Sequence, residues 1–153
     1  MGFKPWRIFL DTSALLAGLI SAKGAAREIL SGGEMRLFEI LVSSQVLLEA
    51  DRNIENKFPR LLLGYRAYMR SCEPTLVEDP TPAQVKAAVP LVGEDDAPML
   101  AAALKAEARF LVTWNTRHFM TSKIPKDLPI QILNPGELIG KWTEFLREST
   151  TGA

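Results

Sequence analysis

The sequence has few of the features that mark several common classes of protein. Its single cysteine, Cys72, can form no intramolecular disulfide, which fits a reducing compartment. The longest apolar runs stop well short of the roughly 20 residues that a membrane-spanning helix needs. The 18 basic residues are balanced by 18 acidic ones, so the chain lacks the global positive charge of many nucleic-acid-binding proteins. A phosphate-bearing partner must therefore be held locally, by a basic patch or by a metal.

Sequence motifs of several enzyme classes are also missing. The first residues, Met1 to Arg7, lack the apolar core and cleavage site of a secretory signal, so we expect a soluble, cytoplasmic protein. No Gly-x-Ser-x-Gly elbow of a serine hydrolase is present. No glycine cluster completes a Rossmann or P-loop fingerprint, so a nucleotide cofactor is not supported.

The residues that are present predict one α/β domain. The composition, 47% hydrophobic and 24% charged, is that of a globular protein, and 153 residues suit a single core. Strand-like runs at 7–11, 37–42, 76–77, 110–113 and 130–133 alternate with helical segments at 12–20, 25–30, 45–58, 61–70, 83–89, 99–108 and 135–147. This alternation predicts a three-layer α/β/α sandwich with a parallel sheet of four or five strands. We expect the domain to span residues 1–147, followed by a frayed tail over 148–153.

One apolar run ends abruptly in a carboxylate. Ile8 to Leu10 is followed by Asp11 and then by small and apolar residues, which predicts a buried strand that delivers an acid to the carboxyl edge of the sheet. Ligands of open α/β sheets bind at that edge. An Asp directly before a helix is also a good N-cap. Taken alone, the stretch supports a catalytic carboxylate and a helix cap equally.

More polar residues follow the other predicted strands at the same edge. They are Ser43 and Ser44 leading to Glu49, Asp95 and Asp96, and Asn115. Carboxylates within about 4–6 Å of one another repel, unless a cation neutralises them. Oxygen ligands favour Mg²⁺ or Mn²⁺, which stabilise in-line displacement at phosphorus. The pattern therefore indicates a divalent-metal site for a phosphate-bearing substrate.

Three of the candidate residues have a structural alternative. Asp95 and Asp96 precede a helix that has Pro98 close to its start, so we expect at least one of the two to act only as a cap. His118, the single histidine, could be a general base. A lone histidine near aromatic residues such as Trp114 more often has a structural role.

Four stretches occur in a fixed order at the predicted strand ends. They are Leu10-Asp11-Thr12-Ser13-Ala14-Leu15, then Ser43-Ser44 with Glu49, then Asp95-Asp96-Ala97-Pro98-Met99-Leu100-Ala101-Ala102-Ala103, then Leu111-Val112-Thr113-Trp114-Asn115-Thr116-Arg117-His118-Phe119. Together they resemble the PIN domain family, and most of all its small bacterial and archaeal single-domain members of the VapC toxin type. The resemblance extends over about residues 8–138.

The resemblance implies a metal-dependent ribonuclease. Members of this type are α/β/α sandwiches in which clustered acids hold Mg²⁺ or Mn²⁺; many are homodimers, and many are neutralised by a small antitoxin encoded beside them. By motif position, Asp11, Glu49 and Asp96 match the three near-constant acids of the family, so they are the expected metal ligands. With Asn115 they are the expected catalytic residues.

This sequence departs from the family at the fourth acidic position. Asn115 stands where many members carry an Asp, and His118 stands where a second acid is common in some of them. The departure removes negative charge from the expected site. Further candidate residues are Asp95, Thr12, Ser13, Thr113, Arg117 and His118, and Arg117 with Lys123 could hold backbone phosphates.

The sequence leaves three functions to weigh. The leading one is hydrolysis of RNA, single-stranded by expectation, by the toxin component of a toxin–antitoxin pair. The missing fourth acid and the neutral net charge also suit a non-catalytic PIN-like module for RNA binding or complex assembly. A phosphatase with Asp11 as covalent nucleophile is disfavoured, because Ser13 stands where the Asp-x-Asp pattern of such enzymes needs its second acid.

Overall fold

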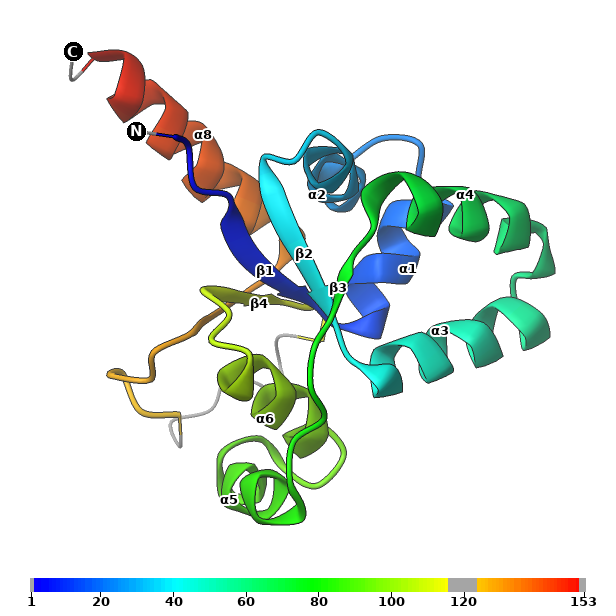
Figure 1. The fold of residues 1–153 in the computed structure, drawn as a ribbon, viewed down its shortest axis with the longest axis vertical. Coiled ribbons are helices and arrows are strands. Elements are labelled where there is room, and N and C mark those ends of the chain that lie inside the picture. Colours follow the sequence, from blue (N-terminus) through cyan, green and yellow to red (C-terminus); the bar gives the residue numbers. More distant parts are fainter. Residues whose placement is uncertain (1, 116–123, 152–153) are drawn as a thin grey trace.

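The computed structural model describes residues 2–115 and 124–151, and this part of the chain folds around one parallel sheet (Figure 1). The strands are β1 (Trp6–Leu10), β2 (Phe38–Val42), β3 (Thr75–Leu76), β4 (Phe110–Val112) and β5 (Gln131–Leu133). Within the described residues the sheet has five strands in the order β3-β2-β1-β4-β5, and every neighbouring pair is parallel. The predicted fold class is confirmed.

Helices connect the strands and cover the sheet. They are α1 (Thr12–Ile20), α2 (Ala25–Glu34), α3 (Ser44–Asn56), the short 3₁₀ helix η1 (Pro59–Leu61), α4 (Leu62–Cys72), α5 (Pro82–Val92), α6 (Ala97–Lys105) and α8 (Pro135–Thr151). The chain moves from β1 to β2 to β3 in one direction and then returns to β4, on the other side of β1. Because such crossovers are right-handed, the reversal puts α5 and α6 on the opposite face from α1 and α2. Figure 1 shows α5 and α6 lying apart from α1, α2 and α8.

The central strands are buried because both faces of the sheet are covered. Ile8, Phe9 and Leu10 are at most 1% exposed, as expected for a strand of a parallel sheet with helices on both sides. At the amino end of the sheet, Trp142 of α8 packs edge-on against Trp6 and Phe38, with ring centroids 4.9 Å apart in each pair. This aromatic cluster fixes the C-terminal helix to the sheet.

Helix α2 is longer than the sequence predicts. It continues through Gly32 and Gly33, whereas a helix ending near Leu30 was expected. A Cβ atom on Gly32 would lie 2.5 Å from the ring of Phe38, and one on Gly33 would lie 2.6 Å from the side chain of Ile40. The two glycines therefore allow α2 to approach the sheet closely and do not end the helix.

Two other helices also continue past their predicted ends. Helix α5 includes Pro90 and stops before Gly93, which has a φ of 86°. Helix α8 extends to Thr151 and so includes residues 148–151, which belong to the stretch where the sequence predicts a frayed tail. The hydroxyls of Ser149 and Thr151 donate to main-chain carbonyls one turn earlier in this helix. Across residues 2–115 and 124–151, we find no helix that is both long enough and apolar enough to cross a membrane.

Candidate metal site

The sheet reverses its direction of winding between β1 and β4, and polar residues follow both strands there. Asp11 comes directly after β1, and Thr113, Trp114 and Asn115 come directly after β4. The backbone N–H of Asp11 donates to the carbonyl of Val112 at 3.0 Å, so the strand pairing continues up to the acid. A reversal of this kind leaves a crevice outside the carboxyl ends of the two strands, which is where such sheets bind ligands.

Asp11 is both a helix cap and a buried acid. Its Oδ1 accepts a hydrogen bond from the backbone N–H of Ser13 at 3.1 Å, which caps α1. Its Oδ2 accepts a hydrogen bond from the hydroxyl of Thr113 at 2.6 Å. The side chain is 6% exposed. The two interpretations that the sequence left open are therefore compatible, because each uses a different carboxylate oxygen.

The surroundings of Asp11 disfavour its negative charge. Burial raises the pKa of Asp11, and the nearby carboxyl groups of Glu49 and Asp96 raise it further, although the hydrogen bonds from Thr113 and Ser13 lower it in part. In the described part of the chain, neither Asp11 nor Glu49 forms an ion pair with a Lys or Arg side chain. A bound cation would relieve this repulsion.

Glu49 faces the same edge from the middle of α3. The buried face of this helix is formed by Val46, Ala50 and Ile54, which leaves Glu49 partly exposed beside it. Its Oε2 accepts a hydrogen bond from the hydroxyl of Thr12 at 2.9 Å, and its Oε1 accepts one from the side-chain amide of Gln45 at 3.1 Å. Because Thr12 is the neighbour of Asp11, this contact joins the first two acids.

Asp96 does not cap α6, contrary to expectation. It immediately precedes the helix, but its backbone is helical (φ −97°, ψ −12°) and its side chain makes no capping hydrogen bond. An N-cap side chain needs an extended backbone to reach the first free N–H groups. Asp95 lies exposed in the preceding turn. The carboxyl group of Asp96 instead acts electrostatically on Asp11.

Thr113 is the centre of a small network of hydroxyl groups. Its single hydroxyl proton is donated to Asp11, so Ser13 must be the donor in the 3.4 Å contact between their hydroxyl oxygens. The oxygens of Ser13 and Thr113 accept hydrogen bonds, both of 3.0 Å, from the backbone N–H groups of Trp114 and Asn115 respectively. This network ties the segment after β4 to the residues around Asp11.

Asn115 lies at the expected edge, but its side chain is exposed. Only its backbone N–H takes part in the network around Thr113. The predicted residues Arg117, His118 and Lys123 lie outside the described residues.

The donor atoms fit a divalent cation that prefers oxygen. Asp11 is buried, uses two of its roughly four lone-pair sites and is opposed by two further carboxyl groups. Among the described residues, no three His, Cys, Asp or Glu side chains are already gathered closely enough to hold a metal ion. Mg²⁺ suits such an open arrangement, because it binds through one or two carboxylates and keeps several waters. Asp11, Glu49 and Asp96 are the residues that could hold it.

Gln45 is a site residue that the sequence reasoning missed. It lies one helical turn before Glu49 on α3 and holds the Oε1 atom of that acid. The spacing of four residues could have indicated this contact, since side chains at i and i+4 are neighbours on a helix. A hollow of about 230 Å³ opens beside Gln45, between the starts of α3 and α6.

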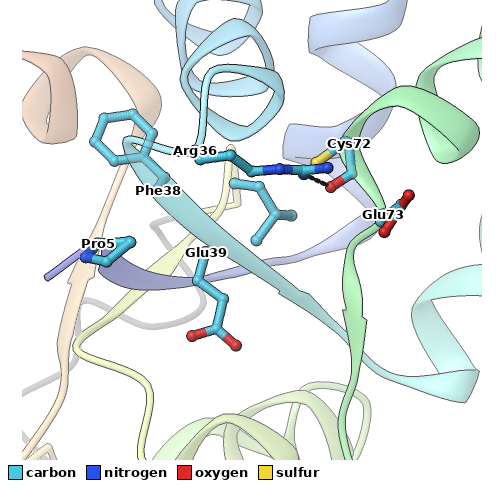
Figure 2. Close-up of a pocket in the computed structure, with 7 residues that line it drawn as sticks. Pro5, Arg36, Phe38, Glu39, Cys72 and Glu73 are labelled. Carbon is cyan, nitrogen blue, oxygen red and sulfur yellow. Dashed lines mark hydrogen bonds between the residues drawn. The ribbon is translucent and has the colours of Figure 1, made fainter.

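A second hollow, of about 320 Å³, lies at the opposite end of the sheet and has a structural role (Figure 2). Arg36, with a φ of 62°, extends its guanidinium across it and donates to the carbonyl of Cys72 at the end of α4. Burial raises the pKa of the Cys72 thiol, which is 2% exposed. A buried, protonated thiol is a poor nucleophile, so Cys72 is not a candidate catalytic residue. The hydrogen bond from Arg36 to the carbonyl of Cys72 joins the ends of α2 and α4.

Comparisons with known proteins identify the family of the chain. A family model described as PIN domain matches residues 7–117, which is more than half of the chain, and the chain therefore belongs to the PIN domain family. A search of curated proteins gave no match.

Two solved structures share the fold. One is DNA-bound VapBC from Salmonella typhimurium, with a TM-score of 0.61 and 20% identity over 85% of this chain and 98% of that chain. The other is VapBC2 from Rickettsia felis bound to a DNA fragment from its promoter, with a TM-score of 0.58 and 17% identity over 83% of this chain and 97% of that chain.

Proposed function

We propose that this chain is a metal-dependent endoribonuclease that hydrolyses RNA phosphodiester bonds. The observation that carries the proposal is the buried Asp11, held by Thr113 and opposed by Glu49 and Asp96 at the point where the sheet reverses. Membership of the PIN domain family supports it.

Each residue around the site has a proposed role. Asp11, Glu49 and Asp96 hold the cation, and Thr113, Thr12 and Gln45 fix the orientation of two of these acids through hydrogen bonds. When bound, Mg²⁺ or Mn²⁺ supplies the positive charge that stabilises an in-line displacement at phosphorus. The exposed amide of Asn115 orients the attacking water or the RNA.

The biological role that we propose is that of the toxin in a toxin–antitoxin pair. Two solved structures with a similar fold are named as VapBC assemblies. By analogy, the proposed partner is a small antitoxin protein. A homodimer and a cytoplasmic location belong to the same proposal.

Cleavage of RNA by the purified protein tests this proposal. Structured and unstructured RNAs are incubated with Mn²⁺ or with a chelator, beside the Asp96→Asn variant. We expect the wild type to cleave single-stranded RNA in Mn²⁺, the chelator to stop the reaction, and the variant to fold normally without cleaving. Undiminished cleavage by a pure preparation of the variant would overturn the assignment of Asp96.

Two observations favour a second function, that of a non-catalytic module for RNA binding or assembly. The fourth acidic position is occupied by Asn115, and the described carboxylates are not gathered into a ready-made ligand set. On this alternative the protein binds RNA but takes up no Mn²⁺ at millimolar concentration. Calorimetry separates the two functions without any assay of activity.

A further inference from the structure

Trp114 is unlike the other two tryptophans of the chain. Trp6 and Trp142 are 6% and 8% exposed and pack against each other in the aromatic cluster at the amino end of the sheet. Trp114 is 52% exposed, at the carboxyl end of the sheet. No aromatic ring or cation of the described residues stacks on it. A large flat apolar side chain therefore faces solvent beside the candidate metal site.

The backbone that carries Trp114 is held in place. Its N–H donates to the hydroxyl of Ser13 at 3.0 Å, and the neighbouring Thr113 and Asn115 are joined by a 3.0 Å hydrogen bond. Thr113 also donates to Asp11. Because these contacts connect Trp114 to the acid through one or two residues, the backbone that carries the indole has a fixed position relative to Asp11. An aromatic side chain on a fixed backbone has only two side-chain torsions left to order when it binds a ligand, which keeps the entropy cost of binding low.

We propose that Trp114 is the platform on which an unpaired base of the RNA stacks, beside the phosphate that is cleaved. This inference rests on the proposed ribonuclease function and specifies its substrate as RNA that is single-stranded at the cleavage site. Base–aromatic stacking tolerates any sequence, because every base has a π-face, but it requires a base that is free of a duplex. The neutral net charge of the chain also makes attraction to phosphates weak, so that stacking contributes a larger share of the binding.

Fluorescence of Trp114 can report this contact without any cleavage. The full chain carrying Asp96→Asn is titrated in a chelator with oligouridine, and separately with an abasic oligonucleotide of the same length and charge. We expect oligouridine to quench the fluorescence and the abasic chain to leave it nearly unchanged. The same titration with Trp114→Phe added should show no quenching, since Trp6 and Trp142 are buried away from the site.

Variants of Trp114 measure how much the stacking contributes. In the same background, binding of labelled oligouridine should weaken about 5- to 150-fold with Trp114→Ala and much less with Trp114→Phe. Leu63→Ala is the matched control, because Leu63 is an exposed apolar residue of α4 with 78% exposure and lies outside the proposed site. This control should bind like the parent.

The outcomes separate this inference from the proposed function. RNA that quenches Trp114 but is not cleaved by the wild type in Mn²⁺ supports the stacking platform and contradicts the nuclease. RNA that the wild type cleaves, with an unchanged KM in Trp114→Ala, contradicts the platform alone. Equal quenching by the abasic chain, or no binding of oligouridine, also overturns it. The platform is also overturned if Trp114→Ala dissociates an oligomer of the protein and leaves RNA binding unchanged. Trp114 would then be a contact between protein chains.

Discussion

The hydroxyl of Thr113 donates to Oδ2 of Asp11 at 2.6 Å, across 102 positions of sequence, in a place where Thr113 is fully buried and Asp11 is 6% exposed. This hydrogen bond joins the ends of β1 and β4 and fixes one oxygen of the acid on which the site is centred. A donor to a buried carboxylate is among the stronger hydrogen bonds of a folded protein.

Replacing Thr113 by valine removes this donor and keeps the shape of the side chain. We expect Thr113→Val to lower the free energy of unfolding by about 1–3 kcal/mol at neutral pH, because the buried carboxylate loses a partner. Urea denaturation measures the change. Thr113→Ser, which keeps a hydroxyl, should recover most of the loss; an equally unstable serine variant would show that the methyl group is what matters.

The raised pKa of Asp11 predicts how stability depends on pH. Because the pKa of this group is higher in the folded state than its ordinary value of 3.8, the folded protein holds the proton more tightly. The contribution of Asp11 to stability therefore falls as the pH rises from 3.8 through the raised pKa, and it stays low at neutral pH. Asp11→Asn removes this dependence.

Melting temperatures at several pH values test this prediction. At neutral pH without metal, Asp11→Asn should melt higher than the wild type, and the difference should shrink as the pH falls toward 3.8. A difference that is the same at every pH would mean that the charge of Asp11 is not its cause.

The contact between Thr12 and Glu49 predicts an effect on metal binding. Thr12→Val leaves Oε2 of Glu49 without its 2.9 Å donor, so the acid is less well oriented. Loss of a partner of this kind weakens metal affinity or activity by about 10- to 100-fold. Titration with Mn²⁺ measures the affinity, and Thr12→Ser is the control that keeps the donor. Unchanged affinity in the valine variant would place Glu49 outside the metal site.

A substitution of Asn115 is expected to strengthen metal binding, whereas the substitution of Thr12 is expected to weaken it. Asn115→Asp adds a fourth carboxylate at an exposed position on the same edge. We expect this variant to bind Mn²⁺ more tightly and to cleave RNA at lower metal concentrations than the wild type, because an added negative charge attracts the cation. Unchanged metal binding by the aspartate variant would show that position 115 contributes nothing to the site.

Parts of this account could be predicted from the sequence because they depend on local patterns. The apolar run before Asp11 predicts the central strand, and the parallel fold then places the ends of β1 and β4 at one edge. Glu49 could be placed near the inward face of its helix by its spacing from Val46. These features follow from periodicity and from the geometry of parallel sheets.

Other parts depend on contacts that a pattern does not contain. The sequence favours a capping role for Asp95 or Asp96. In the structure a turn that begins at Gly93 gives Asp96 a helical backbone, and its side chain makes no capping hydrogen bond. The two glycines of α2 are a pattern that predicts the end of a helix. In the structure they form a surface that packs closely against Phe38 and Ile40. Likewise, the exposure of Trp114 depends on which segments surround it in the fold.

The most direct test of the central claim, that Asp11, Glu49 and Asp96 together hold a divalent cation, is a calorimetric titration of the protein with Mn²⁺. The variants are Asp11→Asn, Glu49→Gln and Asp96→Asn, and Glu55→Gln is the matched control because Glu55 is an exposed acid on the same helix as Glu49. The account predicts binding by the wild type and by the Glu55 variant, and a large loss of affinity in each of the other three. Absence of Mn²⁺ binding by the wild type at millimolar concentration, or equal binding by all the variants, would contradict it.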